Sequence, residues 1–256
     1  MNIYTKLLVG FALIFAVGIH KLSAQTISHR DSLINFDWKF FIGDNPAAKE
    51  KTFTDTKWQT VHLPHDGSIA GGFDTVSGTR QNGFRPRHIG WYRKVLFVPA
   101  SAKGKIISIE FEGVYRAAEV WVNGIYLGKH LNGYTGFTYD VTKHMVAGQT
   151  NTIAVRYDNT YKQSSRWYTG EGIYRNVWLH VKAPLHIVEN GTYITTPFIS
   201  NNQAKISVQT EVVNKADTAV LATLKTVIIS SEGKEVGSML SAVPFACASN
   251  LQLSAV

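Results

Sequence analysis

Residues 111–142 read FEGVYRAAEVWVNGIYLGKHLNGYTGFTYDVT, and this stretch decides the fold class. In residues 118–123, AEVWVN, small or aliphatic side chains alternate with polar or aromatic ones. A period of two is typical of a strand that buries one face in an antiparallel sheet. The Asn123-Gly124 pair is a strong hairpin signal, and Asn132-Gly133 resembles a second turn. The stretch therefore predicts short antiparallel strands joined by tight turns.

The same alternation extends outward from this stretch in both directions. It recurs in residues 106–111 (IISIEF), 153–156 (IAVR) and 177–182 (VWLHVK). No segment after residue 30 shows the period of an amphipathic helix. These patterns predict an all-β protein. Six glycines are expected at strand ends, where positive φ angles or tight turns favour glycine: Gly90, Gly113, Gly124, Gly128, Gly133 and Gly136.

The composition of the chain changes at Pro184. All six Trp precede it, and the residues that follow are rich in Val, Ile, Thr, Ser and Ala. Four strands are expected there, at residues 187–195, 204–213, 221–229 and 251–256. They suit an Ig-like sandwich, but such a sandwich needs about seven strands over roughly 100 residues. We therefore expect one β-sandwich over residues 25–183 and an incomplete Ig-like sandwich over residues 184–256.

Residues 1–24 have the pattern of a cleaved export signal. Lys6 ends a short positive start, Leu7 to Ile19 is an apolar run too short to span a bilayer comfortably, and Ala24 stands at the expected cleavage site. The run is not followed by a cysteine that could carry a lipid. The only cysteine, Cys247, rules out an intrachain disulfide. A periplasmic or secreted location is expected, without membrane contact after cleavage.

The formal net charge of +8 raises the question of a nucleic-acid partner. Lys6 and Lys21 lie in the expected export signal. The remaining basic residues are scattered, as in Arg93-Lys94, and form no basic arm or stripe. We therefore interpret them as a solvated basic surface and expect no nucleic-acid binding.

Four segments, in this order, resemble glycoside hydrolase family 2, especially its bacterial β-galactosidase branch. They are WQTVHLPHDGS (58–68), GWYRKVLFVP (90–99), the stretch 111–142 quoted above, and NTIAVRYDN (151–159) leading to RWYTGEGIYRNVWL (166–179). The resemblance implies a jelly-roll sandwich of the sugar-binding type, then an Ig-like domain, then a (β/α)₈ barrel with two catalytic Glu residues and a retaining mechanism. A barrel needs about 250 residues. No catalytic residue is therefore assigned in this chain, and no cofactor is expected.

The segment RWYTGEGIYR is the main candidate site. Trp or Tyr could cover the apolar face of a sugar, and Arg or Glu could bind its hydroxyls. The resemblance implies that the segment faces the barrel and shapes the rim of the sugar pocket; contact with the barrel alone is the alternative. The candidate residues are Arg166, Trp167, Tyr168, Glu171 and Arg175.

Two candidates depart from the family pattern. Glu171 stands where the family usually has a small residue. Arg166 stands near the place of an acidic metal ligand in some β-galactosidases, so no metal site is expected. Asp66 is a further candidate, next to His65. No nucleophile motif accompanies this pair, so we interpret Asp66 as a turn-capping or domain-contact residue rather than a catalytic acid or base.

Three functions are compatible with these observations. The first is the non-catalytic front part of a retaining exo-β-glycosidase, with β-galactosides ahead of β-glucuronides and β-mannosides as substrates. The second is a free-standing carbohydrate-binding module, and the third a β-sandwich envelope or adhesion protein. Fold alone does not separate them, but the ordered set of segments favours the first. Oligomerisation is left open.

The purified chain is expected to hydrolyse no glycoside, because the paired carboxylates of the mechanism are expected on the barrel. The measurement is turnover of nitrophenyl β-galactoside. Activity above background that persists through further purification would contradict the assignment of no catalytic residue to this chain.

Overall fold

The structure is a computed structural model that describes residues 25–26, 31–76, 78–161 and 167–255. The expected export signal, residues 1–24, and Arg166 lie outside the described residues. The described residues contain strands and three short 3₁₀ helices but no α-helix, which confirms the all-β prediction. None of them forms an apolar helix long enough to cross a membrane. The 3₁₀ helices are η1 (Pro46–Lys49), η2 (Arg80–Asn82) and η3 (Ala100–Ala102).

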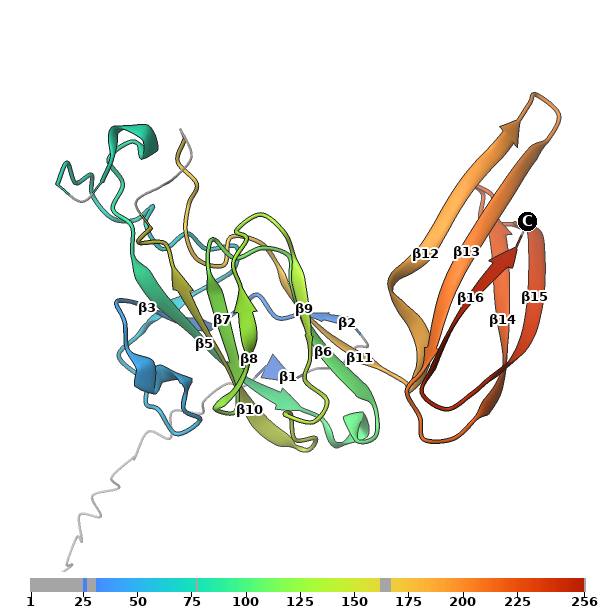
Figure 1. Ribbon diagram of the computed structural model, residues 1–256, viewed down its shortest axis with the longest axis horizontal. Helices are drawn as coiled ribbons and strands as arrows, with labels where there is room; N and C mark the ends of the chain where they lie inside the picture. The colour runs from blue at the N-terminus through green and yellow to red at the C-terminus, as the bar shows by residue number, and fades with distance from the viewer. Residues whose placement is uncertain (1–24, 27–30, 77, 162–166, 256) are drawn as a thin grey trace, which may run out of the picture.

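Two sheets built from β1 to β11 pack face to face as a sandwich (Figure 1). The larger sheet has the order β4-β3-β5-β10-β7-β8, with β1 beside β5. All its pairs are antiparallel except β1 with β5. Its strands are β1 (Gln25–Thr26), β3 (Trp38–Ile42), β4 (Gln59–Val61), β5 (Ile89–Val98), β7 (Ala118–Val122), β8 (Ile125–His130) and β10 (Gln149–Asp158).

The smaller sheet, with the order β2-β11-β6-β9, covers the other side of the core. Ile107, Ile109 and Phe111 point into that core, and the residues between them are partly exposed, as the alternation predicted. The strands of this sheet are β2 (Asp31–Leu33), β6 (Ile106–Phe111), β9 (Phe137–Asp140) and β11 (Val177–Lys182).

The predicted hairpin at Asn123-Gly124 is confirmed. The pair joins β7 to β8, and both residues have positive φ, 51° and 84°. Two central residues with positive φ match the right-handed twist of the flanking strands, which is why Asn-Gly is favoured there.

The prediction that Arg93 and Lys94 belong to a solvated surface was wrong: both are buried. β5 is central and covered on both faces. The segment around η1 lies over its outer face, where Arg93 donates to Asp55 Oδ2 at 2.8 Å and to the Glu50 carbonyl at 3.0 Å. Lys94 donates to the Phe36 carbonyl, and burial lowers the pKa of Lys94 to about 8. Neither cation is available to an external partner.

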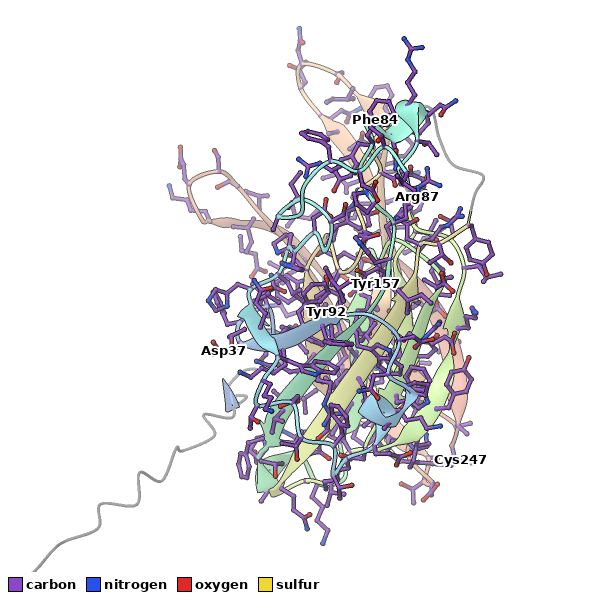
Figure 2. All side chains as sticks on the ribbon, turned by 90° about the vertical axis from the view of Figure 1, so that its left-hand side faces the viewer. Asp37, Phe84, Arg87, Tyr92, Tyr157 and Cys247 are labelled. Carbon is purple, nitrogen blue, oxygen red and sulfur yellow. The ribbon has the colours of Figure 1, made fainter. Side chains whose placement is uncertain are left out.

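Two smaller sheets follow the sandwich, one with the order β12-β13-β16 and the other a β14-β15 hairpin. One of the five strands, β15, was not predicted, because Gly237 and Pro244 interrupt its apolar pattern. Pro244 is tolerated since β15 is an edge strand of a two-stranded sheet. Cys247, labelled in Figure 2, is exposed between β15 and β16. The strands are β12 (Leu185–Ile199), β13 (Ala204–Asn214), β14 (Val220–Ile229), β15 (Glu235–Phe245) and β16 (Ser249–Ala255).

Gly90 lies within β5 rather than at a turn, and what it provides is space. A Cβ on Gly90 would lie 2.4 Å from the ring of Tyr157. We expect Gly90→Ala to lower the free energy of unfolding by about 1–3 kcal/mol, the usual range for overpacking a core. Gly72→Ala is the control, because a Cβ there meets nothing within 4 Å. Urea unfolding of both variants is the measurement, and equal stabilities would contradict the packing argument.

Candidate functional site at the loop end of the sandwich

The carboxylate of Glu171 lies at the centre of the candidate site and is fully buried. Its Oε1 contacts His88 Nδ1 at 2.7 Å and accepts a hydrogen bond from Tyr157 Oη at 3.2 Å. Its Oε2 accepts from the His88 backbone N–H at 3.0 Å and from Asn159 Nδ2 at 3.1 Å. A buried carboxylate is stable only when its oxygens are paired in this way. Glu171 therefore fastens its loop to the start of β5 and the end of β10.

The electrostatics of this cluster keep its partners in their hydrogen-bond-donating forms. The hydrogen bond to Glu171 raises the pKa of His88 above its ordinary value, which favours the imidazolium. Burial raises the pKa of Tyr157, so its hydroxyl keeps its proton. Both side chains can then donate to Glu171.

Asp66 links the same loop to the segment that follows β4. Its Oδ1 accepts from the Ser68 backbone N–H at 2.9 Å, a turn-capping bond, and from the Glu171 backbone N–H at 3.3 Å. Its Oδ2 accepts from Tyr168 Oη at 2.6 Å. Burial raises the pKa of Tyr168, so this hydroxyl stays a donor. The turn-capping contact predicted for Asp66 is therefore present, and the residue also fixes the orientation of Tyr168.

His65 does not act with Asp66. Its Nδ1 lies 2.8 Å from Tyr92 Oη, and its ring packs edge-on against Phe40. Burial lowers the pKa of His65, which favours the neutral ring. Figure 2 shows Tyr92 and Tyr157 within the sandwich, with Arg87 and Phe84 beyond them at the loop end.

Trp167 is an exposed candidate residue, with 58% of its surface open to solvent. Its Nε1 lies 3.3 Å from Tyr134 Oη, and Tyr134 is itself half exposed. Arg175 is also exposed, with its guanidinium 5.6 Å from the centroid of the Tyr174 ring. The loop thus combines a buried hydrogen-bond network around Glu171 with an exposed aromatic side chain.

The structure divides the described site residues into three groups by exposure. Trp167 and Arg175 lie at the surface, and Asp66 and Tyr168 are half-buried. Glu171, a candidate for sugar binding or barrel contact, is enclosed, and its side chain reaches neither from this position. No local pattern indicates the partners of Glu171, since His88 is 83 residues away in the chain. A separate group that could hold a metal ion lies on β2, β11 and β12: Asp31, His180 and Glu189.

An antiparallel two-sheet sandwich that presents aromatic side chains from its loops has the architecture of a carbohydrate-binding β-sandwich. Residues 80–184 match the family described as glycosyl hydrolases family 2, sugar binding domain. The chain therefore carries the sugar-binding domain of glycosyl hydrolases family 2.

Relatives of known name include both β-galactosidases and β-glucuronidases. The chain is 41% identical to β-galactosidase BoGH2A of Bacteroides ovatus over 86% of its length and 26% of that protein. It is 35% identical to a β-glucuronidase of Formosa agariphila over 78% of its length and 22% of that protein. The chain thus spans about a quarter of the length of these relatives.

Solved structures show the same architecture. A glycosyl hydrolase family 2 member from Bacteroides cellulosilyticus superposes with a TM-score of 0.84 at 32% identity, covering 89% of this chain and 30% of that one. A β-glucuronidase of Bacteroides uniformis gives a TM-score of 0.77 at 29% identity, covering 88% and 27%.

Glu171→Gln is expected to lower the free energy of unfolding by about 2–4 kcal/mol. An NH₂ group, itself a donor, replaces one carboxylate oxygen and faces the hydrogen-bond donors around it. Glu232→Gln, at an exposed ion pair, is the control and should change stability by less than about 0.5 kcal/mol. The comparison is made by urea unfolding at pH 6.

The gap between the wild type and Glu171→Gln should also depend on pH. His88 binds its proton more tightly in the folded chain, so this contribution is complete below the unfolded-state pKa of about 6.5 and is lost as the pH rises through the higher folded-state pKa. Proton NMR titration of the His88 ring is the direct measurement. A pKa that does not fall in the variant would contradict the role of Glu171.

Proposed function

We propose that this chain is the non-catalytic front part of a retaining exo-β-glycosidase that acts on β-galactosides. The coarser assignment, a family 2 glycosidase, rests on the domain match and on relatives of both kinds. The choice of β-galactosides is supported by the higher identity to the Bacteroides ovatus β-galactosidase, 41% against 35% for the β-glucuronidase.

The observation that carries the proposal is an exposed aromatic side chain next to a loop that hydrogen bonds hold in place. Tyr168 is held by Asp66 and Glu171 is held by four donors, so the backbone on both sides of Gly170 has little freedom. Trp167 directly precedes these hydrogen-bonded residues in the chain and is mostly exposed. Its Nε1 lies 3.3 Å from Tyr134 Oη, so two exposed aromatic side chains meet at this position and could cover a sugar or another domain. In the proposal, Trp167 contacts the catalytic barrel and forms part of the rim of its sugar site.

The proposal includes a division of the chain into a jelly-roll domain over residues 25–183 and an Ig-like domain from residue 184. It is supported by the strand pairing, because no sheet of the described residues combines strands from β1–β11 with strands from β12–β16. Export to the periplasm or the medium, based on the pattern of residues 1–24, is also part of it.

The test uses the product of the continuous reading frame that contains this chain. We expect higher kcat/KM on nitrophenyl β-galactoside than on nitrophenyl β-glucuronide. Trp167→Ala should lower kcat/KM about tenfold, equivalent to about 1.4 kcal/mol. Tyr193→Ala is the control: Tyr193 is a similarly exposed aromatic residue on β12 and should leave kcat/KM unchanged.

Two outcomes would replace the proposal. A preference for the glucuronide would assign the chain to a β-glucuronidase. Saturable calorimetric binding of galactose or lactose by the chain alone, lost in Trp167→Ala, would make it a free-standing carbohydrate-binding module. The proposal expects no such binding by the chain alone.

A further inference from the structure

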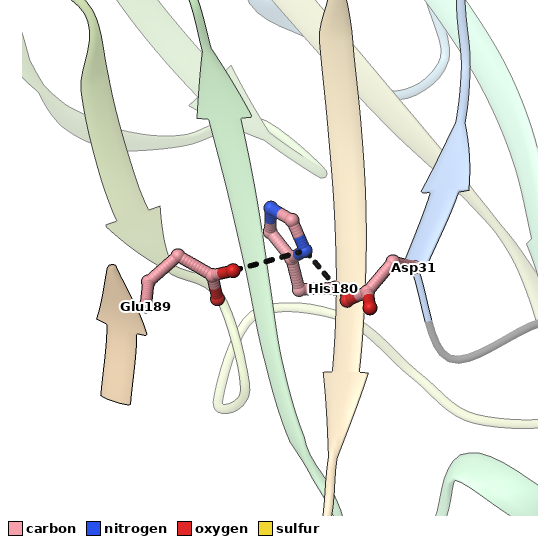
Figure 3. A group of neighbouring side chains, drawn as sticks. All are labelled: Asp31, His180 and Glu189. Carbon is pink, nitrogen blue, oxygen red and sulfur yellow. Dashed lines mark hydrogen bonds and ion pairs between the residues drawn. The ribbon is translucent and has the colours of Figure 1, made fainter. Parts of the chain in front are cut away.

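We propose that Asp31, His180 and Glu189 form a divalent-metal site of the zinc class. The three side chains come from β2, β11 and β12 (Figure 3). The site would join the sandwich to the first strand of the sheets that follow it, and it does not depend on the function proposed for the loop end.

The geometry brings three ligand atoms together. His180 is buried, and its Nδ1 lies 2.8 Å from Asp31 Oδ1 and 3.9 Å from Glu189 Oε1. One ligand atom from each residue lies within 4.8 Å of the others. Zinc bonds of about 2.0–2.2 Å place neighbouring ligand atoms roughly 3–4 Å apart. A small movement of the exposed Asp31 side chain would therefore admit an ion.

A fourth residue fixes the imidazole in the orientation that a metal requires. Glu110 Oε2 lies 3.0 Å from His180 Nε2, on the opposite side of the ring. A carboxylate that accepts the second ring N–H of a ligating histidine is a regular feature of zinc sites. With its proton on Nε2, the ring directs the Nδ1 lone pair toward the oxygens of Asp31 and Glu189. A bound ion would take the place of the proton in the hydrogen bond that joins Nδ1 to Asp31 Oδ1, and three electron-pair donors would then converge on the ion.

The local charge also favours a divalent ion. Asp31, Glu110 and Glu189 carry three negative charges around the imidazole, and Lys182 supplies one positive charge. Lys182 pairs with Oε2 of Glu189 and leaves Oε1 facing His180. The cluster is left with two negative charges. One divalent cation balances both, whereas a proton on His180 would balance only one.

The donor types indicate which ions fit. One imidazole and two carboxylates suit zinc and neighbouring transition metals, whereas Mg²⁺ and Ca²⁺ prefer sites made of oxygen alone. Three protein ligands leave coordination positions for water. Because the ligands lie on three strands, a bound ion would hold β12 against the sandwich and stabilise the folded chain.

The test is calorimetric titration of the untagged, EDTA-treated and dialysed chain with ZnCl₂. We expect saturable binding with one ion per chain and a rise in the thermal midpoint on zinc addition. His180→Gln and Glu189→Gln should each weaken binding at least tenfold and reduce the rise. His186→Gln is the matched control, since His186 bonds to the Ala183 carbonyl and lies outside the cluster.

Asp31→Asn provides a second variant at an exposed position, in case the buried His180 variant does not fold. It should weaken zinc binding at least tenfold while leaving the circular dichroism spectrum unchanged. If Asp31→Asn and Glu189→Gln both bound zinc as tightly as the wild type, the ion would lie elsewhere and the proposal would be overturned. Absence of saturable binding in the wild type would overturn it too, leaving the cluster as an ion-pair network only.

Discussion

The loop that precedes β11 depends on the hydrogen bonds that surround the buried carboxylate of Glu171. Moving a carboxylate out of water carries a penalty of several kcal/mol, so the fold has to surround it with donors. His88, Tyr157 and Asn159 meet that requirement from the start of β5 and the end of β10. The central strands of the larger sheet thereby determine the path of a loop that reaches the surface. The position of Trp167 therefore depends on the buried carboxylate of Glu171, which no ligand can contact.

A second carboxylate, that of Asp66, extends this hydrogen-bond network to a neighbouring loop. Its three accepted hydrogen bonds join the turn after β4 to the loop before β11, segments about a hundred residues apart in the chain. Preorganised side chains bind with a smaller loss of conformational entropy than mobile ones. A surface built this way suits a rim that must keep its shape whether it meets a sugar or another domain.

Local patterns predicted the fold because the determinants of strands and hairpins are local. Alternation predicted β6, and Asn123-Gly124 predicted the turn between β7 and β8. Burial of charge was not predictable in the same way. Arg93 is enclosed only because the η1 segment crosses the outer face of β5. The surroundings of Glu171 and His180 depend on partners 83 and 149 residues away, and no spacing in the sequence encodes such contacts.

The placement of two residue types gives the chain separate natural reporters. All six Trp precede Pro184, five of them in the described sandwich away from the exposed loop position of Trp167, whereas the single thiol, Cys247, lies exposed among the small sheets. Indole emission therefore reports on β1–β11, and a maleimide dye on Cys247 reports on β12–β16. Loosening of one part of the chain can be followed in the same cuvette as loosening of the other, without any engineered label site.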